Sequence, residues 1–363
     1  MALLTLSRVT KRYGPRGTPA VEELSLAVEP GEILALLGPS GCGKTTTLRL
    51  IAGFETLDAG EITIGGRVVG RAGDPGVPPE ERGVGVVFQD YALFPHLTVA
   101  DNVAFGLTRL PRDERARRVA EILELVGLTA FRARYPHELS GGQQQRVAAA
   151  RALAPAPAVL LLDEPFSNLD ADLRAQMRDE VEKLLRETGT TAIFVTHDQE
   201  EAFTIADQVG VLHAGHLAQL APPETVYHHP ATPFVAEFVG AADFLPGLVT
   251  AQGVVTEIGV FANDGRAPGE KVQVMIRPDD VTFAPSEAGA AVIVRRYFRG
   301  SENLYCLRLP SGHRVHSSQP SSVVFAPGTR VQPQAHVLHV VVFSEGASTA
   351  PSDASPQPRT APA

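Results

Sequence analysis

The chain has 363 residues, enough for two or three domains of about 150 residues each. Its 32 basic and 41 acidic residues leave a net charge of −9, which argues against coating nucleic acid or an anionic membrane through bulk charge. The two cysteines, Cys42 and Cys306, stand far apart and suggest neither a disulfide framework nor a metal cluster. No apolar run is long enough to span a bilayer, so a membrane role would depend on partner chains.

Residues 1 to about 235 alternate β-rich runs with helical patterns, which predicts an α/β fold around a largely parallel sheet. The expected strands are Glu32–Leu37, Gly85–Phe88, Val159–Leu162, Thr191–Val195 and Gln208–His213. The expected helices are Lys44–Ala52, Glu114–Val126, Gly142–Ala154, Leu173–Thr188 and Gln199–Ala206. Helical patterns cluster without an obvious strand over about 90–157, which indicates an inserted helical subdomain.

The pattern changes after Pro230, where β-like runs alternate with turn residues. These runs are Val272–Ile276, Ala291–Tyr297, Leu304–Leu309 and Val337–Phe343. They predict a small all-β domain at 241–345 that follows an α/β domain at 1–240. The segment 346–363 is rich in Ser, Thr, Pro and Ala and is expected to be a disordered tail.

The first chemical motif is Gly38-Pro-Ser-Gly-Cys-Gly-Lys44-Thr45, a full match to Gly-x4-Gly-Lys-Ser/Thr between an apolar strand and a helical pattern. Glycines let backbone N–H groups curl around phosphate oxygens. Lys44 is placed to reach the β- and γ-phosphates, and the hydroxyl of Thr45 can bind Mg²⁺. The candidate nucleotide-binding residues of this motif are Gly38, Pro39, Ser40, Gly41, Cys42, Gly43, Lys44, Thr45 and Thr46.

The second motif is an apolar run, Val159–Leu162, that ends in the carboxylates of Asp163 and Glu164. Ligand sites of α/β proteins lie at the carboxyl ends of such strands. Asp163 is placed to hold Mg²⁺ through water, and Glu164 is a candidate general base for water that attacks the γ-phosphate. Acidic residues after a strand equally often cap a helix, so the catalytic interpretation depends on the phosphate loop.

The third motif is Leu139-Ser140-Gly141-Gly142-Gln143 at the start of a helical pattern. Free N–H groups, a hydroxyl and the positive end of the helix dipole make such a position an anion site. Five specified positions recur by chance about once in millions of positions. With these three motifs the sequence resembles the ATP-binding subunits of ABC transporters, densely over about 1–240, and the resemblance implies an active ATPase.

The resemblance implies roles for further residues. Tyr13 resembles the aromatic residue that stacks on adenine, and Gln89 the glutamine that touches Mg²⁺ and the attacking water. His197 resembles the switch histidine on the γ-phosphate. The implied catalytic residues are Glu164, His197, Gln89 and Lys44, and the implied Mg²⁺ ligands are Thr45, Gln89 and Asp163.

In this family two copies pack head to tail, and ATP lies between the phosphate loop of one and the signature helix of the other. The resemblance therefore implies that a partner copy contributes Ser140, Gly141, Gly142, Gln143 and Asp170 to the ATP site. ATP is expected to close this homodimer and hydrolysis to open it. Transmembrane permease subunits are expected to dock near Tyr91–Leu97, although a plain core role for this apolar segment stays open. The expected location is peripheral, at the cytoplasmic face of the membrane.

The C-terminal domain resembles the OB-like TOBE accessory domain of bacterial importer ATPases for sugars, polyamines, sulfate, thiamine and ferric iron. The matching stretches are Phe238–Gly240, Asp243–Gly247 and Met275–Asp279. Three stretches have sequences most similar to those of ferric-iron importer subunits: Pro79–Gly85, Asp90–Val99 and Tyr227–Val235. This resemblance predicts ferric iron as the cargo. Polyamine, thiamine, sulfate and sugar are the alternatives, and a separate substrate-binding protein is the implied indirect partner.

A different class of function also stays open. The chain could be a soluble, non-transport ABC ATPase whose OB-like domain binds nucleic acid, since Arg295–Arg299 has the basic and aromatic character of such surfaces. The acidic chain and the importer-type motifs weigh against it, and nucleic acid is not an expected partner.

Overall fold

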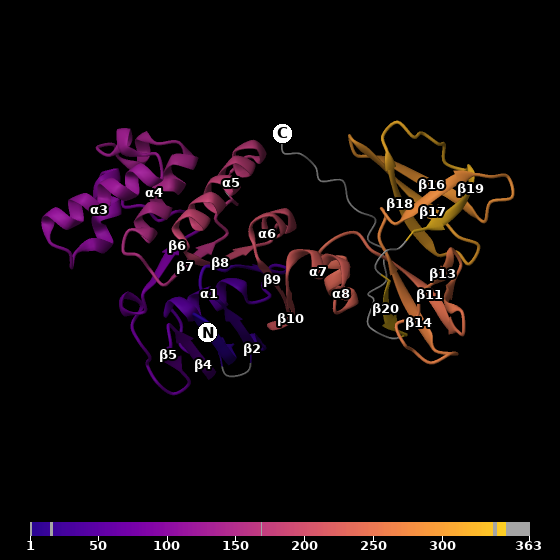
Figure 1. Cartoon of the computed structure of the whole chain (residues 1–363), viewed down its shortest axis with the longest axis horizontal. Helices are drawn as coiled ribbons and strands as arrows, with labels where there is room; N and C mark the ends of the chain where they lie inside the picture. The colour runs from indigo at the N-terminus through magenta and orange to yellow at the C-terminus, as the bar shows by residue number, and fades with distance from the viewer. Residues whose placement is uncertain (1, 15–16, 168, 337–339, 346–363) are drawn as a thin grey trace. The chain divides into compact units, whose positions relative to one another are not determined.

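The computed structural model describes residues 2–14, 17–167, 169–336 and 340–345. The chain divides into two compact units, Met1–Pro223 and Glu224–Ala363 (Figure 1). Within the described ranges, no helix is both long and apolar enough to cross a membrane.

A six-stranded sheet lies at the centre of the first unit, in the order β10-β9-β3-β8-β7-β6. Its strands are β3 (Ile33–Leu37), β6 (Val84–Val87), β7 (Val159–Asp163), β8 (Thr191–Thr196), β9 (Gln208–His213) and β10 (His216–Ala221). All neighbouring pairs are parallel except β10 with β9. Strands β3 and β8 are buried along their whole length, as an apolar run in a parallel sheet requires. The predicted parallel sheet is confirmed.

Three helices follow strands of this sheet: α1 (Lys44–Ala52), α5 (Ala171–Thr188) and α6 (Gln199–Ile205). Each agrees with a predicted helix within two residues at either end. Helix α1 begins directly after the phosphate loop, because Gly43 at its N-cap adopts a left-handed φ of 107° that ends the loop.

A second sheet in this unit is antiparallel, and the sequence patterns missed it. Its order is β2-β1-β4-β5, from β1 (Leu4–Arg12), β2 (Pro19–Val28), β4 (Ala59–Ile64) and β5 (Arg67–Arg71). Positive φ angles at Arg8 (46°) and Glu23 (48°) and a register shift after Leu6 break the alternation of inward and outward residues. The period of two, which is the signal for a strand, is therefore lost.

The predicted helical subdomain is confirmed between β6 and β7. It contains α2 (Val99–Ala104), α3 (Arg112–Leu125) and α4 (Gly141–Leu153), with 3₁₀ turns at Phe105–Leu107, Thr129–Phe131 and Pro136–Glu138. A further 3₁₀ turn, Pro79–Glu81, precedes β6. Val103 of α2, Ile122 of α3 and Val147 of α4 belong to one buried cluster, which gives these helices a hydrophobic core of their own.

The second unit begins with two short helices, α7 (Pro223–His228) and α8 (Pro233–Phe238), and continues as two antiparallel sheets. One has the order β13-β12-β11-β14-β20 and the other β15-β19-β16-β17-β18. The strands are β11 (Asp243–Thr250), β12 (Gly253–Thr256), β13 (Gly259–Phe261), β14 (Lys271–Ile276), β15 (Val281–Pro285), β16 (Ala291–Phe298), β17 (Glu302–Arg308), β18 (Arg314–Pro320), β19 (Arg330–Ala335) and β20 (Val341–Ser344). One buried cluster joins the sheets, with Val274 from the first and Leu307 from the second. The all-β prediction is confirmed.

Arg277 fastens the two short helices to the strands that follow. Its guanidinium donates to the carbonyl oxygens of Tyr227 at 2.8 Å, Ala236 at 2.9 Å and Ala241 at 3.0 Å. Residues 224–240 thus join the second compact unit, and the domain boundary expected after residue 240 stays a prediction. The expected strand at 337–343 begins outside the described residues, where the expected tail 346–363 also lies.

Candidate functional site

The predicted site residues follow four strands that are adjacent in the sheet. The phosphate loop follows β3, His197 follows β8, Asp163 and Glu164 end β7, and Gln89 follows β6. Because these strands are parallel, their carboxyl ends meet at one edge. The sheet order therefore brings together groups that are far apart in the sequence.

The ammonium group of Lys44 lies inside the phosphate loop. Its Nζ donates to the carbonyl oxygens of Gly38 at 2.7 Å and Pro39 at 3.0 Å, and the residue is only 6% exposed. The buried thiol of Cys42 lies 3.9 Å from the same nitrogen. Burial raises the pKa of Cys42, and the nearby Lys44 charge partly offsets this rise. The loop thus holds a fixed positive charge against its backbone, as a phosphate site requires.

Two glycines of the loop cannot be replaced without a steric clash. A Cβ atom on Gly43 would lie 2.2 Å from the carbonyl oxygen of Ala20, and one on Gly38 would lie 2.4 Å from that of Leu212. Gly43 also has a φ of 107°, which residues with a side chain rarely adopt. The close backbone approach explains why the loop needs glycine at these positions.

Thr45 and Asp163, two of the predicted Mg²⁺ ligands, are in contact. The Thr45 hydroxyl donates to Oδ1 of Asp163 at 3.1 Å. Burial raises the pKa of Asp163, while the hydrogen bond from Thr45 acts in the opposite direction. Among the described residues no cluster of three His, Cys, Asp or Glu side chains could hold a metal, so a cation here would also need phosphate oxygens or water. A hydroxyl and a carboxylate are hard oxygen donors that fit Mg²⁺.

Glu164 and His197 also face each other. Oε2 of Glu164 lies 3.5 Å from Nδ1 of His197. Glu164 has a φ of 46°, and its N–H donates to the Val195 carbonyl at 3.1 Å while Ser167 Oγ donates to its carbonyl at 3.0 Å. Such left-handed backbone at a non-glycine residue is costly and concentrates at functional sites. Here it follows the end of β7 and places the carboxylate beside the imidazole.

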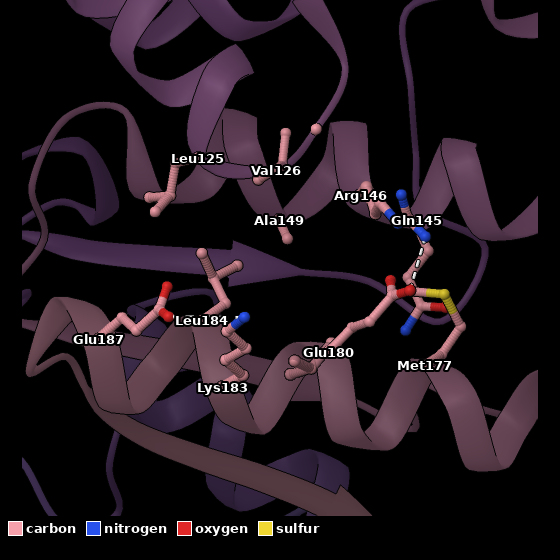
Figure 2. Close-up of a pocket in the computed structure, with 12 residues that line it drawn as sticks. Leu125, Val126, Gln145, Arg146, Ala149, Met177, Glu180, Lys183, Leu184 and Glu187 are labelled. Carbon is pink, nitrogen blue, oxygen red and sulfur yellow. Dashed lines mark hydrogen bonds and ion pairs between the residues drawn. The ribbon is translucent and has the colours of Figure 1, made fainter.

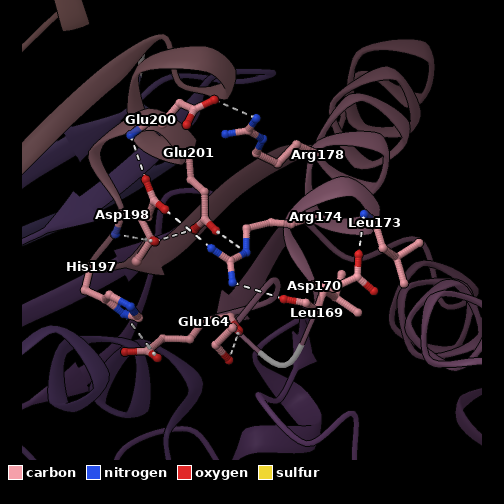
Figure 3. A network of polar contacts seen from close by, with 12 residues as sticks. Glu164, Leu169, Asp170, Leu173, Arg174, Arg178, His197, Asp198, Glu200 and Glu201 are labelled. Carbon is pink, nitrogen blue, oxygen red and sulfur yellow. Dashed lines mark hydrogen bonds and ion pairs between the residues drawn. The ribbon is translucent and has the colours of Figure 1, made fainter. Parts of the chain in front are cut away.

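Arg174 links the segments on both sides of this pair, as Figure 3 shows. From α5 it donates to the Leu169 carbonyl at 3.0 Å and forms ion pairs with Asp198 at 3.7 Å and Glu201 at 4.0 Å. Burial raises the pKa of Glu201, which also accepts a hydrogen bond from Thr196. The sequence patterns missed Arg174, because nothing in its neighbourhood distinguishes it from other helix-surface arginines.

The residues predicted to reach a partner copy cap helices of this chain. The Ser140 hydroxyl accepts from the Gln143 N–H at 3.4 Å, and the Gln143 side chain accepts from the Ser140 N–H at 3.0 Å, which is a capping box at the start of α4. Asp170 caps α5 by accepting from the Leu173 N–H at 2.9 Å. Gly142 packs against α5, where an added Cβ would lie 3.2 Å from the sulfur of Met177. The contact with a partner stays a prediction.

Tyr13 and Gln89 are placed where a ligand could reach them. Tyr13 directly follows β1 and is 50% exposed, with Nζ of Lys11 5.5 Å from the centre of its ring. Gln89 is exposed two residues beyond the end of β6. An exposed aromatic ring of this kind can stack on a flat ligand.

The segment Tyr91–Leu97 is held in an unusual conformation. Tyr91 and Ala92 have φ values of 61° and 45°, and Arg151 of α4 donates to their carbonyl oxygens at 2.9 Å and 2.6 Å. The ring of Phe94 packs 4.3 Å from that of Phe105, which is 54% exposed. The Tyr91 side chain is buried, so the segment is partly core and partly surface.

Two protein families match this chain. The ABC transporter family matches residues 21–167, and the TOBE domain family matches residues 274–343. The spermidine/putrescine import ATP-binding protein of Rubrobacter xylanophilus is 45% identical over 358 residues, which cover 93% of both chains. The trehalose/maltose import ATP-binding protein of Thermococcus litoralis is 46% identical over 326 residues, which cover 84% of this chain and 86% of the relative.

A solved structure, the dimer of the ATP-binding cassette MJ0796 bound to ADP and Pi, matches with a TM-score of 0.53 and 33% identity. The match covers 61% of this chain and 98% of that one. These relatives are named for polyamine and sugar import, so the predicted assignment to the ferric-iron group finds no support. The chain belongs to the ABC transporter family as an import-type ATP-binding subunit, an ATPase coupled to transport that carries a TOBE domain.

Proposed function

We propose that this ATPase works through the residues gathered at the carboxyl edge of the six-stranded sheet. The observation that carries the proposal is the meeting of two pairs there: Thr45 with Asp163 at 3.1 Å, and Glu164 with His197 at 3.5 Å. Each pair joins residues that lie at or beyond the carboxyl ends of different strands, and the chemistry of each pair fits one part of ATP hydrolysis: metal binding for the first and proton transfer for the second.

The phosphate loop and the residues around it bind ATP and its metal ion. Lys44 and the loop N–H groups bind the phosphates, and Tyr13 stacks on adenine. Thr45, Asp163 and Gln89 hold Mg²⁺, which when bound supplies positive charge beside the phosphate oxygens. The fit is supported by the hydroxyl–carboxylate contact and by the glycine cradle, which has no room for a side chain at two positions.

Glu164 and His197 carry out the hydrolysis of ATP. Glu164 accepts a proton from the water that attacks the γ-phosphate, and the neighbouring His197 contacts the γ-phosphate and helps position that water. The short distance between the two side chains supports a shared role. Arg174 acts as a positioning residue. It donates to the Leu169 carbonyl and forms ion pairs with Asp198 and Glu201, the carboxylates that follow His197 in the sequence.

The variant Glu164→Gln tests this assignment. It keeps the size and most of the hydrogen bonding of the side chain but cannot accept a proton, so ATP binding should stay and turnover should fall by about 10²-fold or more. ATP affinity and ATPase rate are measured on the same preparation, with Asp179→Asn, at an exposed position of α5, as the control. Normal turnover by Glu164→Gln would overturn the role of the general base.

We also propose a homodimer and a permease contact. The dimeric structure of the related MJ0796 cassette supports the first, with Ser140–Gln143 and Asp170 of one copy reaching the ATP of the other. The exposed ring of Phe105 beside Phe94 supports the second, since exposed aromatic side chains mark protein contacts. Helix α4 connects the two proposed contact regions. It begins directly after Ser140, and its Arg151 donates hydrogen bonds to the carbonyl oxygens of Tyr91 and Ala92. The subunit would then work at the cytoplasmic face of the membrane.

For the cargo we propose a polyamine such as spermidine or putrescine. The support is the name of the relative that matches 93% of the chain, and a substrate-binding protein would select this cargo outside the membrane. Uptake of labelled putrescine and of labelled maltose is compared in a strain without this gene and in the complemented strain. Putrescine uptake should be lost without the gene and restored by complementation. If only maltose uptake is lost, the cargo is a sugar and not a polyamine.

A further inference from the structure

The imidazole of His197 has little packing of its own to hold it opposite Glu164. Its side chain is 62% exposed, and its Nδ1 lies 3.5 Å from Oε2 of Glu164. The rotamers open to such a side chain depend on the dihedral angles of its backbone. The position of the imidazole is therefore set by the turn between β8 and α6, to which His197 belongs.

The hydroxyl of Thr196 closes this turn around His197. The N–H of Asp198 donates to Oγ1 of Thr196 at 3.0 Å, so the two sequence neighbours of His197 are tied to each other. Thr and Ser form short turns in this way, because their hydroxyls reach the backbone two residues further on. The turn holds only while a lone pair of Oγ1 points at the Asp198 N–H.

Glu201 sets the direction of that hydroxyl. The Thr196 hydroxyl donates its proton to Oε2 of Glu201, which leaves a lone pair of Oγ1 for the Asp198 N–H. Glu201 lies in the first turn of α6, four residues after His197, and is 4% exposed. Together with Glu164 and His197 it lines a cavity of about 30 Å³. The buried carboxylate thus acts, through one hydroxyl, on the turn that carries the imidazole.

The burial of this carboxylate is costly, which argues against a role in stability alone. Moving a carboxylate out of water costs several kcal/mol. Arg174 offsets part of this cost, with its Nε 4.0 Å from Oε1 of Glu201, as Figure 3 shows. That distance is the limit of an ion pair, and burial raises the pKa of Glu201 in spite of it. An apolar side chain would fill the position at a lower cost in free energy, so what the carboxylate orients explains its presence better.

The helix that carries Arg174 is anchored on its other side. There Arg146 of α4 donates to Glu180 of α5 at 2.7 Å, as Figure 2 shows. Met177 lies one turn before Glu180 on the same side of α5 and is buried. Helix α5 is therefore a fixed support, from which the guanidinium of Arg174 holds the Glu201 carboxylate in place.

We propose that Glu201 is a positioning residue for His197: through the Thr196 hydroxyl it fixes the turn that presents the imidazole to the γ-phosphate. This inference rests on the role of His197 in the proposed function. Misplacing a catalytic group by about 1 Å lowers a rate by up to about 100-fold. Loosening the turn should therefore lower kcat about tenfold, while the KM for ATP stays within about twofold because the phosphate loop is unchanged.

Two exchanges at Thr196 provide the test. Thr196→Val keeps the shape of the side chain but removes the hydroxyl, and it should lower kcat about tenfold with little change in KM. Thr196→Ser keeps the hydroxyl, and its kcat should lie within about twofold of the wild-type value. Thr191→Val is the matched control, because it removes the hydroxyl of a buried threonine at the other end of β8, where Oγ1 accepts from the Gly31 N–H at 2.7 Å. It should lower the free energy of unfolding and leave kcat unchanged.

Glu201 is exchanged in the same way. Glu201→Gln keeps an acceptor oxygen for the Thr196 hydroxyl and should retain kcat within about threefold, whereas Glu201→Leu should match the tenfold loss of Thr196→Val. The double variant Glu201→Leu/Thr196→Val should be no slower than either single variant, because both break the same chain of hydrogen bonds. ATP affinity, measured on each preparation, shows that the variants are folded.

Wild-type kcat in Thr196→Val would overturn the positioning role, and so would an equal loss in Thr191→Val or multiplied losses in the double variant. His197→Ala separates this result from the proposed function. Normal turnover in His197→Ala would remove the role of His197 itself. Slow turnover in His197→Ala beside normal turnover in Thr196→Val would overturn the role of Glu201 alone.

Discussion

The Thr45 hydroxyl donates to Oδ1 of Asp163 at 3.1 Å, across a sequence separation of 118 residues. Thr45 lies in the first turn of α1 and Asp163 at the end of β7, and β8 separates β3 from β7 in the sheet. The contact joins the phosphate loop to the acidic strand end. The fold therefore brings together two of the three predicted metal ligands.

Removing the carboxylate of this pair should weaken metal use. Asp163→Asn keeps the size of the side chain but loses its charge, and the Mg²⁺ concentration for half-maximal ATPase activity should rise about 10- to 100-fold. Thr45→Ser, which keeps the hydroxyl, should stay close to the wild-type value. A Mg²⁺ titration of the ATPase rate measures both. An unchanged titration curve for Asp163→Asn would remove this residue from the metal site.

Two loop glycines should differ in their tolerance of alanine. Gly43 and Gly41 both have positive φ values, 107° and 80°, but an added Cβ meets the Ala20 carbonyl at 2.2 Å only at Gly43 and meets nothing within 4 Å at Gly41. Gly43→Ala should lower the free energy of unfolding by about 2–4 kcal/mol, against about 1 kcal/mol for Gly41→Ala. Urea unfolding without nucleotide measures both. Equal losses would show that backbone strain, not the clash, limits the loop.

The chain contains no tryptophan, which makes Tyr13 easy to test. Tyr13→Trp should keep ATP binding and report it by a change in tryptophan emission, because an indole also stacks on adenine. Tyr13→Ala should weaken ATP binding about tenfold, which corresponds to about 1.4 kcal/mol. Phe298→Trp, at an exposed position of the second unit, is the matched control and should not respond. An unresponsive Tyr13→Trp would argue against stacking.

The second unit should lose stability at alkaline pH through His316. Its Nδ1 lies 2.9 Å from Oδ1 of Asp243, and the hydrogen bonds with Asp243 and Cys306 raise the pKa of His316 from 6.5 to about 10. Because the folded pKa is the higher one, the stabilisation is complete below pH 6.5 and is lost as the pH rises towards 10. The slope should approach about 1.4 kcal/mol per pH unit between these values.

Asp243→Asn should flatten this dependence, because the uncharged amide no longer favours the imidazolium. Urea unfolding of the full chain at several pH values, followed through the methyl resonance of Met275, reports on the second unit. The same slope in the variant and the wild type would assign the alkaline loss to another group.

Local patterns predicted most of the α/β unit because each signal is contained in a few neighbouring residues. The apolar run Val159–Leu162 is buried at every position and can be recognised as a strand without reference to its neighbours in the sheet. The predicted ends of helix α1 agree with the observed ones, because a glycine stands at each end of the pattern. In the structure both glycines, Gly43 and Gly53, adopt a left-handed φ that ends the helix. The sheet β2-β1-β4-β5 was missed, because bulges in β1 interrupt the period on which strand prediction depends.

The sequence by itself determined the family and the chemistry, because the phosphate loop, the acidic strand end and Ser140–Gln143 are short motifs whose residue types carry the function. Only the tertiary structure decided which groups meet. Thr45 contacts Asp163, Glu164 faces His197, and Arg174 ties the neighbouring segments together. It also buried the amide of Gln145, which has no hydrogen-bond partner among the described residues. The physical reason is that these contacts depend on the order of parallel strands and on helix packing, which are set by the burial of apolar residues along the whole chain and not by any local run.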